Sequence, residues 1–171
     1  MSEPTAILPF ARRSDLSTSD CLAFYRKLAA GVTVVTAAGE TGPDGATASA
    51  VTSVSLRPPL LLACLSTDSR TLAAIRARRV FAVHLLAEDQ RHISTAFAEK
   101  RENRFADQEW EPVHGAPVLT ATPAWAVCRV ADTRHYGDHA LVVGRLIAAH
   151  SGPGRPLLWH DRDYWRISEG S

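Results

Sequence analysis

Several motifs that would identify common classes of enzyme are absent from this sequence of 171 residues. It contains no GxSxG, HExxH or P-loop motif, and its seven histidines have no recognised metal-ligand spacing. The glycines Gly39, Gly42 and Gly45 are no dinucleotide fingerprint, because they lie in a predicted hairpin turn and do not open a helix. The sequence therefore predicts no metal site and no catalytic side chain of the protein's own.

Cysteines and long apolar segments are also scarce. Cys21, Cys64 and Cys128 are widely spaced and form no CxxC pair, which argues against a disulfide framework and against zinc. No apolar run approaches the roughly 18 residues that span a bilayer, and no apolar segment follows Arg12 and Arg13 as it would in a signal peptide. We therefore expect a soluble, cytoplasmic protein.

An excess of charge of either sign is missing too. The chain has 19 basic and 18 acidic residues and a net charge of +1, so no overall field attracts nucleic acid or an anionic membrane. With 46% hydrophobic residues, the chain can bury one substantial core. Residues 1–18 mix proline, serine and charge without a period and predict a mobile leader. Residues 19–171 predict one domain.

Periodicity predicts a mainly β fold with helices, of the α+β class. Helices are expected at residues 21–30, 69–77 and 88–100. Strands are expected at residues 32–38, 47–56, 60–66, 80–86, 118–119, 124–136, 140–150 and 162–167. Residues 110–117 read as a loop because of their prolines and glycine. This order of elements predicts a small β-barrel with attached helices.

The first predicted helix has apolar residues at the spacing of a buried face. Ser19 or Asp20 could cap it, and Gly31 would supply a left-handed stop. The residues expected to face the core are Leu22, Tyr25, Leu28 and Ala29. In the strand at residues 80–86, His84 is expected to be a packed or hydrogen-bonded core histidine.

Residues 46–66 are the most informative stretch. Small and hydroxyl side chains lead to Pro58 and Pro59, after which an apolar run continues to Leu65. Two strands joined at this corner, lined with small residues, leave room for a flat ligand against the backbone. Hydroxyls and amides on that surface suit carbonyls, ribityl hydroxyls and a phosphate. A serine- and threonine-rich edge strand that faces water remains the alternative.

A second informative feature follows directly. Asp68 is a candidate cap for the helix at residues 69–77, and free amides at a helix N-terminus favour anions. The hydroxyls of Ser69 and Thr71 and the guanidinium of Arg70 add donors there. The alternative is that these hydroxyl residues merely begin a helix.

Three segments occur together in one known family, in the same order. They are GVTVVT at residues 31–36, CLSTDSRT at residues 64–71 and GDH at residues 137–139. From about residue 21 to residue 167 the chain resembles the short-chain flavin reductases, the reductase components of two-component flavin-dependent monooxygenases. The resemblance implies the FMN-binding split β-barrel fold.

The resemblance also implies roles for particular residues. The flavin ring and ribityl chain would be lined by Thr47, Ala48, Ser49, Ser53 and Val54, with Cys64, Leu65 and Ser66 continuing the wall. The phosphate would lie at Ser69, Arg70 and Thr71, and Phe97 and Ala98 would lie near the flavin. Gly137, Asp138 and His139 would meet NAD(P)H, although on its own this segment reads as a plain hairpin turn.

The activity implied is an NAD(P)H:flavin oxidoreductase, in which hydride passes directly from the nicotinamide to FMN or FAD. Reduced flavin would go to a partner monooxygenase, and the protein would be a homodimer. NADH is favoured over NADPH because no basic cluster offers itself for a 2′-phosphate. Two alternatives remain open: a flavoprotein that reduces a corrinoid or a ferric chelate, and a non-enzymatic protein that binds flavin or haem.

Overall fold

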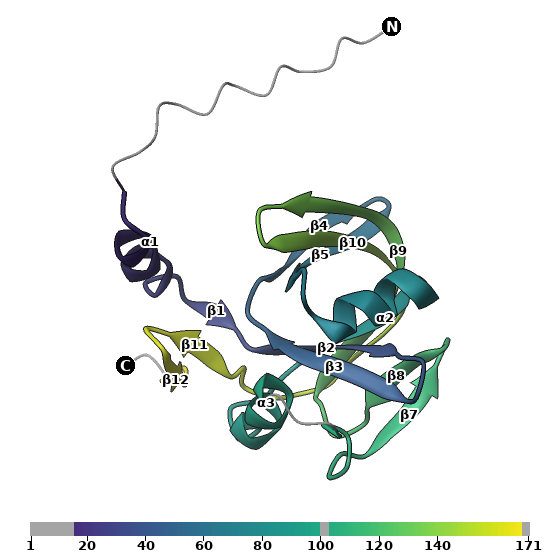
Figure 1. The fold of residues 1–171 in the computed structure, drawn as a ribbon. Coiled ribbons are helices and arrows are strands. Elements are labelled where there is room, and N and C mark those ends of the chain that lie inside the picture. The colour runs from purple at the N-terminus through teal and green to yellow at the C-terminus, as the bar shows by residue number, and fades with distance from the viewer. Residues whose placement is uncertain (1–15, 100–102, 169–171) are drawn as a thin grey trace, which may run out of the picture.

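The computed structural model describes residues 16–99 and 103–168 of the chain. Its centre is an antiparallel sheet of seven strands: β2 (Thr33–Ala38), β3 (Pro43–Ala48), β4 (Val51–Leu56), β5 (Pro59–Ser66), β6 (Val80–Leu85), β9 (Ala124–Tyr136) and β10 (His139–Ser151). Their order in space is β3-β2-β6-β9-β10-β5-β4 (Figure 1). The mainly β fold with attached helices agrees with the expectation from periodicity.

The two edges of this sheet come from one continuous stretch of sequence. β3 forms one edge and β4 the other, although only Ser49 and Ala50 separate them. The sheet must therefore curl until its edges approach, and the Ala50 carbonyl accepts a hydrogen bond of 2.9 Å from the amide of Cys64 in β5. A single strand over residues 47–56 was expected; that expectation is wrong, because the chain leaves β2 after residue 48 and continues along β5.

Helix α2 (Arg70–Arg78) covers the inner face of the curled sheet. Its Leu72 and Ile75 are buried with Phe81 of β6 in the largest apolar cluster. The helix was predicted, but Ser69 caps it instead of Asp68, through a hydroxyl that accepts a 3.4 Å hydrogen bond from the amide of Leu72. The cap satisfies the Leu72 amide, one of the N-terminal amides that have no partner within the helix.

Helix α3 (Arg91–Ala98) lies against β3. It buries Ile93 and Phe97 in a second apolar cluster. A side chain at Gly45 of β3 would meet the Phe97 ring at 2.7 Å, so the close approach of helix and strand depends on that glycine. The predicted helix at residues 88–100 is longer than the observed one, and residue 100 lies outside the described residues.

His84 of β6 is fully buried, as expected from its place in an apolar strand. Its Nδ1 lies 3.0 Å from the carbonyl oxygen of Val34, and its Nε2 accepts a 3.0 Å hydrogen bond from the amide of Leu119. These partners require a neutral ring with the proton on Nδ1. Burial lowers the pKa of His84 from 6.5 to about 4, although the hydrogen bond to Val34 acts in the opposite direction.

Helix α1 (Thr18–Tyr25) differs from its prediction at both ends. Ser17 caps it, and the Asp20 side chain returns a hydrogen bond to the Ser17 amide, which completes a capping box. The helix thus begins within the segment expected to be a leader, whose residues 1–15 lie outside the described part of the chain. Gly31 belongs to the short strand β1 (Ala30–Gly31) and does not stop the helix.

The apolar face of α1 is not buried. None of its residues is buried. Leu22, Tyr25 and, just after the helix, Leu28 are each about half exposed or more. In Figure 1, α1 lies beyond β1 and away from the seven-stranded sheet. The expectation that this face packs on the core of the same chain is therefore wrong.

Two smaller sheets complete the fold. β1 joins β11 (Leu158–His160) and β12 (Asp163–Trp165) in the order β1-β11-β12. β7 (Trp110–Val113) and β8 (Ala116–Leu119) form a hairpin where a loop was expected over residues 110–117. His114 and Gly115 turn this hairpin with φ angles of 48° and 85°. Prolines did not prevent pairing there, because the hairpin is an isolated two-stranded sheet with open outer edges.

Candidate functional site

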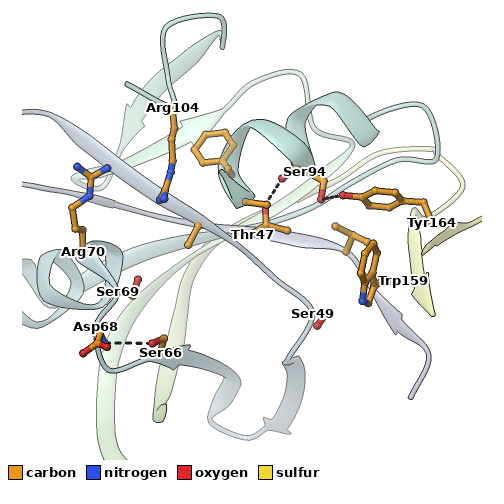
Figure 2. Close-up of a pocket in the computed structure, with 14 residues that line it drawn as sticks. Thr47, Ser49, Ser66, Asp68, Ser69, Arg70, Ser94, Arg104, Trp159 and Tyr164 are labelled. Carbon is orange, nitrogen blue, oxygen red and sulfur yellow. Dashed lines mark hydrogen bonds between the residues drawn. The ribbon is translucent and has the colours of Figure 1, made fainter. Parts of the chain in front are cut away.

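A cavity of about 790 Å³ opens where β3, α2, α3 and the β11–β12 hairpin meet (Figure 2). This volume lies within the range of pockets that hold small molecules and cofactors. The residues that line it are Val32, Ala46, Thr47, Ser49, Ser66, Asp68, Ser69, Arg70, Ser94, Phe97, Ala98, Arg104, Trp159 and Tyr164. The chemistry of these side chains changes from one end of the cavity to the other.

One end, which we call the α2 end, consists of Ser66, Asp68, Ser69, Arg70 and Arg104. The first turn of α2 contains no acidic residue, so the partial positive charge of the helix N-terminus is not offset from within the helix. Arg70 and Arg104 lie beside that turn in Figure 2. Amides, hydroxyls and two guanidinium groups form a set of donors that suits a phosphate.

A partly buried carboxylate organises the α2 end. The Asp44 side chain is 15% exposed; its Oδ2 lies 3.3 Å from Arg70 Nε, and its Oδ1 lies 3.8 Å from Arg104. Arg104 also donates hydrogen bonds to the Gly45 carbonyl and, at 2.8 Å, to the Glu99 carbonyl. Both guanidinium groups are therefore fixed at the cavity wall.

Asp44 also explains the position of Thr71. The Thr71 hydroxyl donates a 2.8 Å hydrogen bond to Asp44 Oδ1, and the residue is fully buried. Thr71 was predicted to bind phosphate directly, but it does not line the cavity. It acts behind the wall, as a partner of the carboxylate that holds the arginines.

The middle of the cavity presents small and hydroxyl residues. Thr47 of β3 lines it, although its hydroxyl is already engaged in a 2.6 Å hydrogen bond to the Ser94 carbonyl of α3. Ser49, at the crossing between β3 and β4, is exposed toward the cavity. This polar section suits a hydroxylated chain that runs between two bulkier groups.

The opposite end, which we call the aromatic end, consists of Trp159 and Tyr164. Neither residue was predicted to belong to the site. Their short strands face each other across Asp161 and Arg162, whose φ angles are 50° and 67°. The two strands have three residues each and are too short to show a period, so no strong signal in the sequence indicated this hairpin.

The segment Gly137, Asp138 and His139 turns the chain between β9 and β10, with Gly137 at φ 58°. His139 pairs with Ser66 of the α2 end across β10 and β5. The carbonyl of Asp138 accepts hydrogen bonds from the amide and the hydroxyl of Thr67, at 2.9 and 3.1 Å. The turn is thus fastened beside the cavity without lining it.

The side chains of this turn interact with each other. His139 Nδ1 lies 2.8 Å from Asp138 Oδ1, and this hydrogen bond holds the pKa of the Asp138 carboxyl below its usual value. Both side chains are exposed and so remain free to meet a second ligand. Cys64 lies close enough for Asp138 to raise its thiol pKa, but burial is the larger cause.

The predicted site residues fall into three groups. Those that line the cavity are Thr47, Ser49, Ser66, Ser69, Arg70, Phe97 and Ala98. Those that support the wall from behind, or lie beside it, are Ala48, Cys64, Leu65, Thr71, Gly137, Asp138 and His139. Ser53 and Val54 are exposed on the edge strand β4, outside the cavity. Ser94, Trp159 and Tyr164 line the cavity but were not predicted, whereas the resemblance implied that Arg104 closes the pocket's edge.

Groups for acid, base or metal chemistry are not gathered at this site. Within residues 16–99 and 103–168, no three histidine, cysteine or acidic side chains are placed to hold a metal ion. Burial raises the pKa of the Cys64 thiol, which disfavours a reactive thiolate. In the same part of the chain, no helix has the length and apolar character that crossing a membrane requires.

Comparison with known proteins identifies the family. The sequence profile described as "Flavin reductase like domain" matches residues 25–168. The chain is 38% identical to the NADH:FMN oxidoreductase of Rhodococcus qingshengii over 167 residues, which cover 91% of this chain and 87% of that protein. It belongs to the flavin reductase family, as the sequence motifs indicated.

Two further relatives extend this result. The reductase component of 4-nitrophenol 4-monooxygenase/4-nitrocatechol 2-monooxygenase from Rhodococcus opacus is 40% identical over 132 residues, covering 77% of this chain and 71% of that protein. The solved NADH:FAD oxidoreductase SgcE6 of Streptomyces globisporus C-1027, in complex with NAD and FAD fragments, superposes with a TM-score of 0.83 at 30% identity. That match covers 88% of this chain and 93% of SgcE6. The predicted split-barrel fold is confirmed by these structural relatives.

Proposed function

We propose that the chain is an NADH-dependent flavin reductase that supplies reduced FMN or FAD to a partner flavin-dependent monooxygenase. Its relatives carry the names NADH:FMN oxidoreductase and monooxygenase reductase component. The observation that carries the proposal is the order of chemistry along the cavity: donors for a phosphate, then a hydroxyl-lined middle, then two aromatic rings. A flavin nucleotide has its phosphate, ribityl chain and ring system in the same order.

Particular residues have roles in this proposal. Ser69, Arg70 and Arg104 bind the phosphate, and Asp44 keeps the two guanidinium groups in place. Thr47 and Ser49 flank the ribityl chain. A bound flavin would accept a hydride from a nicotinamide held against it, so the protein's task is to orient the two rings and to exclude water.

The nicotinamide nucleotide approaches from the β9–β10 turn. His139 offers an imidazole that can hydrogen-bond a carboxamide or stack on a ring, and Asp138 fixes its orientation. We infer NADH as the preferred donor, in line with the names of the relatives. Reduction of a corrinoid or a ferric chelate, and flavin or haem binding without turnover, remain the competing functions.

The test is the absorption spectrum of the purified protein together with NADH oxidation on addition of FMN, FAD, a ferric chelate or a corrinoid. We expect rapid oxidation of NADH with either free flavin and slow reduction of the other acceptors. Faster turnover with a corrinoid or a chelate would favour the first competing function. A yellow protein that does not oxidise NADH would favour the second.

We also infer a homodimer. The apolar face of α1 is exposed in the single chain, as are Phe24 of the same helix and Trp165 of β12. Apolar surface of this kind is typical of an interface between chains. Light scattering at micromolar concentration should give twice the mass of the chain; a monomer with full activity would contradict the inference. The cytoplasmic location expected from the three unpaired cysteines stays a prediction.

A further inference from the structure

The aromatic end of the cavity is built by a pair of facing residues on the C-terminal hairpin. Trp159 of β11 pairs with Tyr164 of β12, and their ring centroids are 4.9 Å apart at an interplanar angle of 71°. Both rings line the cavity and are only partly buried. A flat aromatic surface is therefore presented to whatever occupies this end.

The hairpin is attached to α3 at the cavity wall. The Tyr164 hydroxyl lies 2.9 Å from the hydroxyl of Ser94, a residue that is 1% exposed. The guanidinium carbon of Arg91 lies 4.7 Å from the centre of the Tyr164 ring, on its face. These two contacts fix the plane of Tyr164 and, through edge-to-face packing, the position of Trp159. Figure 2 shows the contact between Tyr164 and Ser94.

Trp159 and Tyr164 pack against the second apolar cluster, but core packing accounts for only part of this arrangement. Phe97 and Phe105 also meet edge to face, with centroids 5.0 Å apart, but both are almost fully buried. Trp159 and Tyr164 instead leave part of their surface open to the cavity. Stacking on such a surface tolerates many ring substituents, because every planar conjugated ring has a π face.

We propose that Trp159 stacks on the isoalloxazine ring of the flavin and that Tyr164 is the residue that positions it. This inference rests on the proposed function and assigns the ring end of the flavin to the C-terminal hairpin. The α2 end and the aromatic end face each other across Thr47 in Figure 2, so a phosphate at Arg70 directs the ring toward Trp159. Two contacts at opposite ends of one cavity then contribute to flavin affinity. At the α2 end, protein donors bind the phosphate, and at the aromatic end Trp159 stacks on the ring.

Binding of riboflavin, FMN and FAD, measured by equilibrium dialysis without NADH, tests the assignment. Trp159→Leu keeps an apolar side chain but removes the conjugated ring, and it should raise the dissociation constants of riboflavin and FMN by the same factor, about tenfold. Trp159→Phe should recover most of the affinity. Trp165→Leu is the matched control on the same hairpin, because Trp165 does not line the cavity and should leave binding unchanged.

Fluorescence of the bound flavin gives a second readout that a purely structural role would not change. An indole in contact with the ring quenches flavin emission, so emission at saturating riboflavin should rise in Trp159→Leu. Tyr164→Phe removes the hydroxyl that meets Ser94 but keeps the ring. It should raise flavin emission less than Trp159→Leu does, and it should also lower flavin affinity less. Urea unfolding midpoints near that of the unaltered protein establish that the variants are folded.

Other outcomes overturn the assignment. Riboflavin binding and emission unchanged in a folded Trp159→Leu protein would remove Trp159 from the ring site. A loss confined to FAD would place the adenine there, and a loss confined to the Michaelis constant of NADH would place the nicotinamide nucleotide there. NADH oxidation by the unaltered protein with added FMN is measured separately. If the proposed function is wrong, this turnover will be absent. If only the assignment of Trp159 is wrong, turnover will be present but riboflavin binding will not change in Trp159→Leu.

Discussion

The interior of the barrel and the wall of the cavity satisfy their polar groups in opposite ways. Inside, His84 uses both ring nitrogens on backbone partners, and Thr36 donates to the Pro117 carbonyl at 2.5 Å. Among the described residues, no buried side-chain polar atom lacks a partner. At the cavity wall, Ser49 remains exposed, as does His139 beside the cavity, and the arginines of the α2 end share one carboxylate.

Because of this difference, substitutions in the interior should affect mainly stability, and substitutions at the wall should affect mainly ligand binding. A polar group in the interior is fully paired, so a change there disturbs folding and has no selective effect on a ligand. A group at the wall keeps donors for a partner that arrives later, so a change there should alter affinity with little cost to the fold. Each prediction below tests one side of this comparison.

The largest expected effect concerns His84 and acid. In the folded protein its pKa is about 4, against 6.5 for an unperturbed histidine, so the unfolded chain binds the proton first as the pH falls. The stability that His84 contributes is fully present above pH 6.5 and is lost progressively between pH 6.5 and about 4. That loss corresponds to about 3 kcal/mol in the free energy of unfolding.

Urea unfolding at several pH values between 4 and 7 measures this effect. His84→Gln keeps a donor and an acceptor but does not titrate, so its stability should depend on pH less steeply than that of the unaltered protein. Carboxylates titrate in both proteins, and the difference between the two curves isolates the histidine. Parallel curves would show that His84 is not the group that limits acid stability.

Gly144 should show the next largest effect. A side chain at this position of β10 would meet the Phe81 ring at 2.5 Å and the Cys128 Cβ at 2.7 Å, and both neighbours are fully buried. Gly144→Ala should lower the free energy of unfolding by roughly 1–3 kcal/mol. Gly31→Ala is the control, because nothing lies within 4 Å of its added Cβ. Equal urea midpoints for the two variants would contradict the packing argument.

The interior was largely predictable from the sequence. Strands such as β2 and β6 are continuous apolar runs with β-branched residues, and α2 has Leu72 and Ile75 at helical spacing. His84 could be assigned to the core because its neighbours in the strand are apolar. Local pattern and final burial agree wherever an element is long enough to display its period.

The wall was predicted less completely, because its parts are distant in sequence. Ser94 and Tyr164 are 70 residues apart, and β11 and β12 have three residues each, too few to reveal a period. Asp44 was read only as a turn residue, although it organises both arginines of the α2 end. The apolar spacing of α1 predicted a face that packs on the core of the same chain, and nothing local could say that its own barrel does not cover it.

Two substitutions of Ser69 that differ in charge give a prediction for the cavity wall. Ser69→Asp and Ser69→Asn both place good capping residues before α2, so the helix should remain stable in each. Aspartate adds a negative charge at the α2 end and should weaken FMN binding about tenfold, whereas asparagine should change it little.

Riboflavin, which carries no phosphate, sharpens this test. Its affinity should be nearly equal in Ser69→Asp and Ser69→Asn, because the added charge lies at the opposite end from the ring. Dialysis with FMN and with riboflavin gives both values. If Ser69→Asp weakened riboflavin as strongly as FMN, the phosphate would not lie at the α2 end.

The smallest expected effect concerns Thr67, which fastens the β9–β10 turn through the Asp138 carbonyl. Thr67→Val removes the hydroxyl contact and leaves the amide contact, so the turn should loosen without unfolding. If His139 orients the nicotinamide, the Michaelis constant for NADH should rise about fivefold, as expected for about 1 kcal/mol from one hydrogen bond. Turnover at saturating NADH and the affinity for FMN should stay close to their original values, because the flavin wall is untouched.

Thr120→Val, at an exposed residue after β8, controls for the loss of a threonine hydroxyl. A rise in the dissociation constant for FMN equal to the rise in the Michaelis constant would mean that the turn supports the flavin and not the nicotinamide.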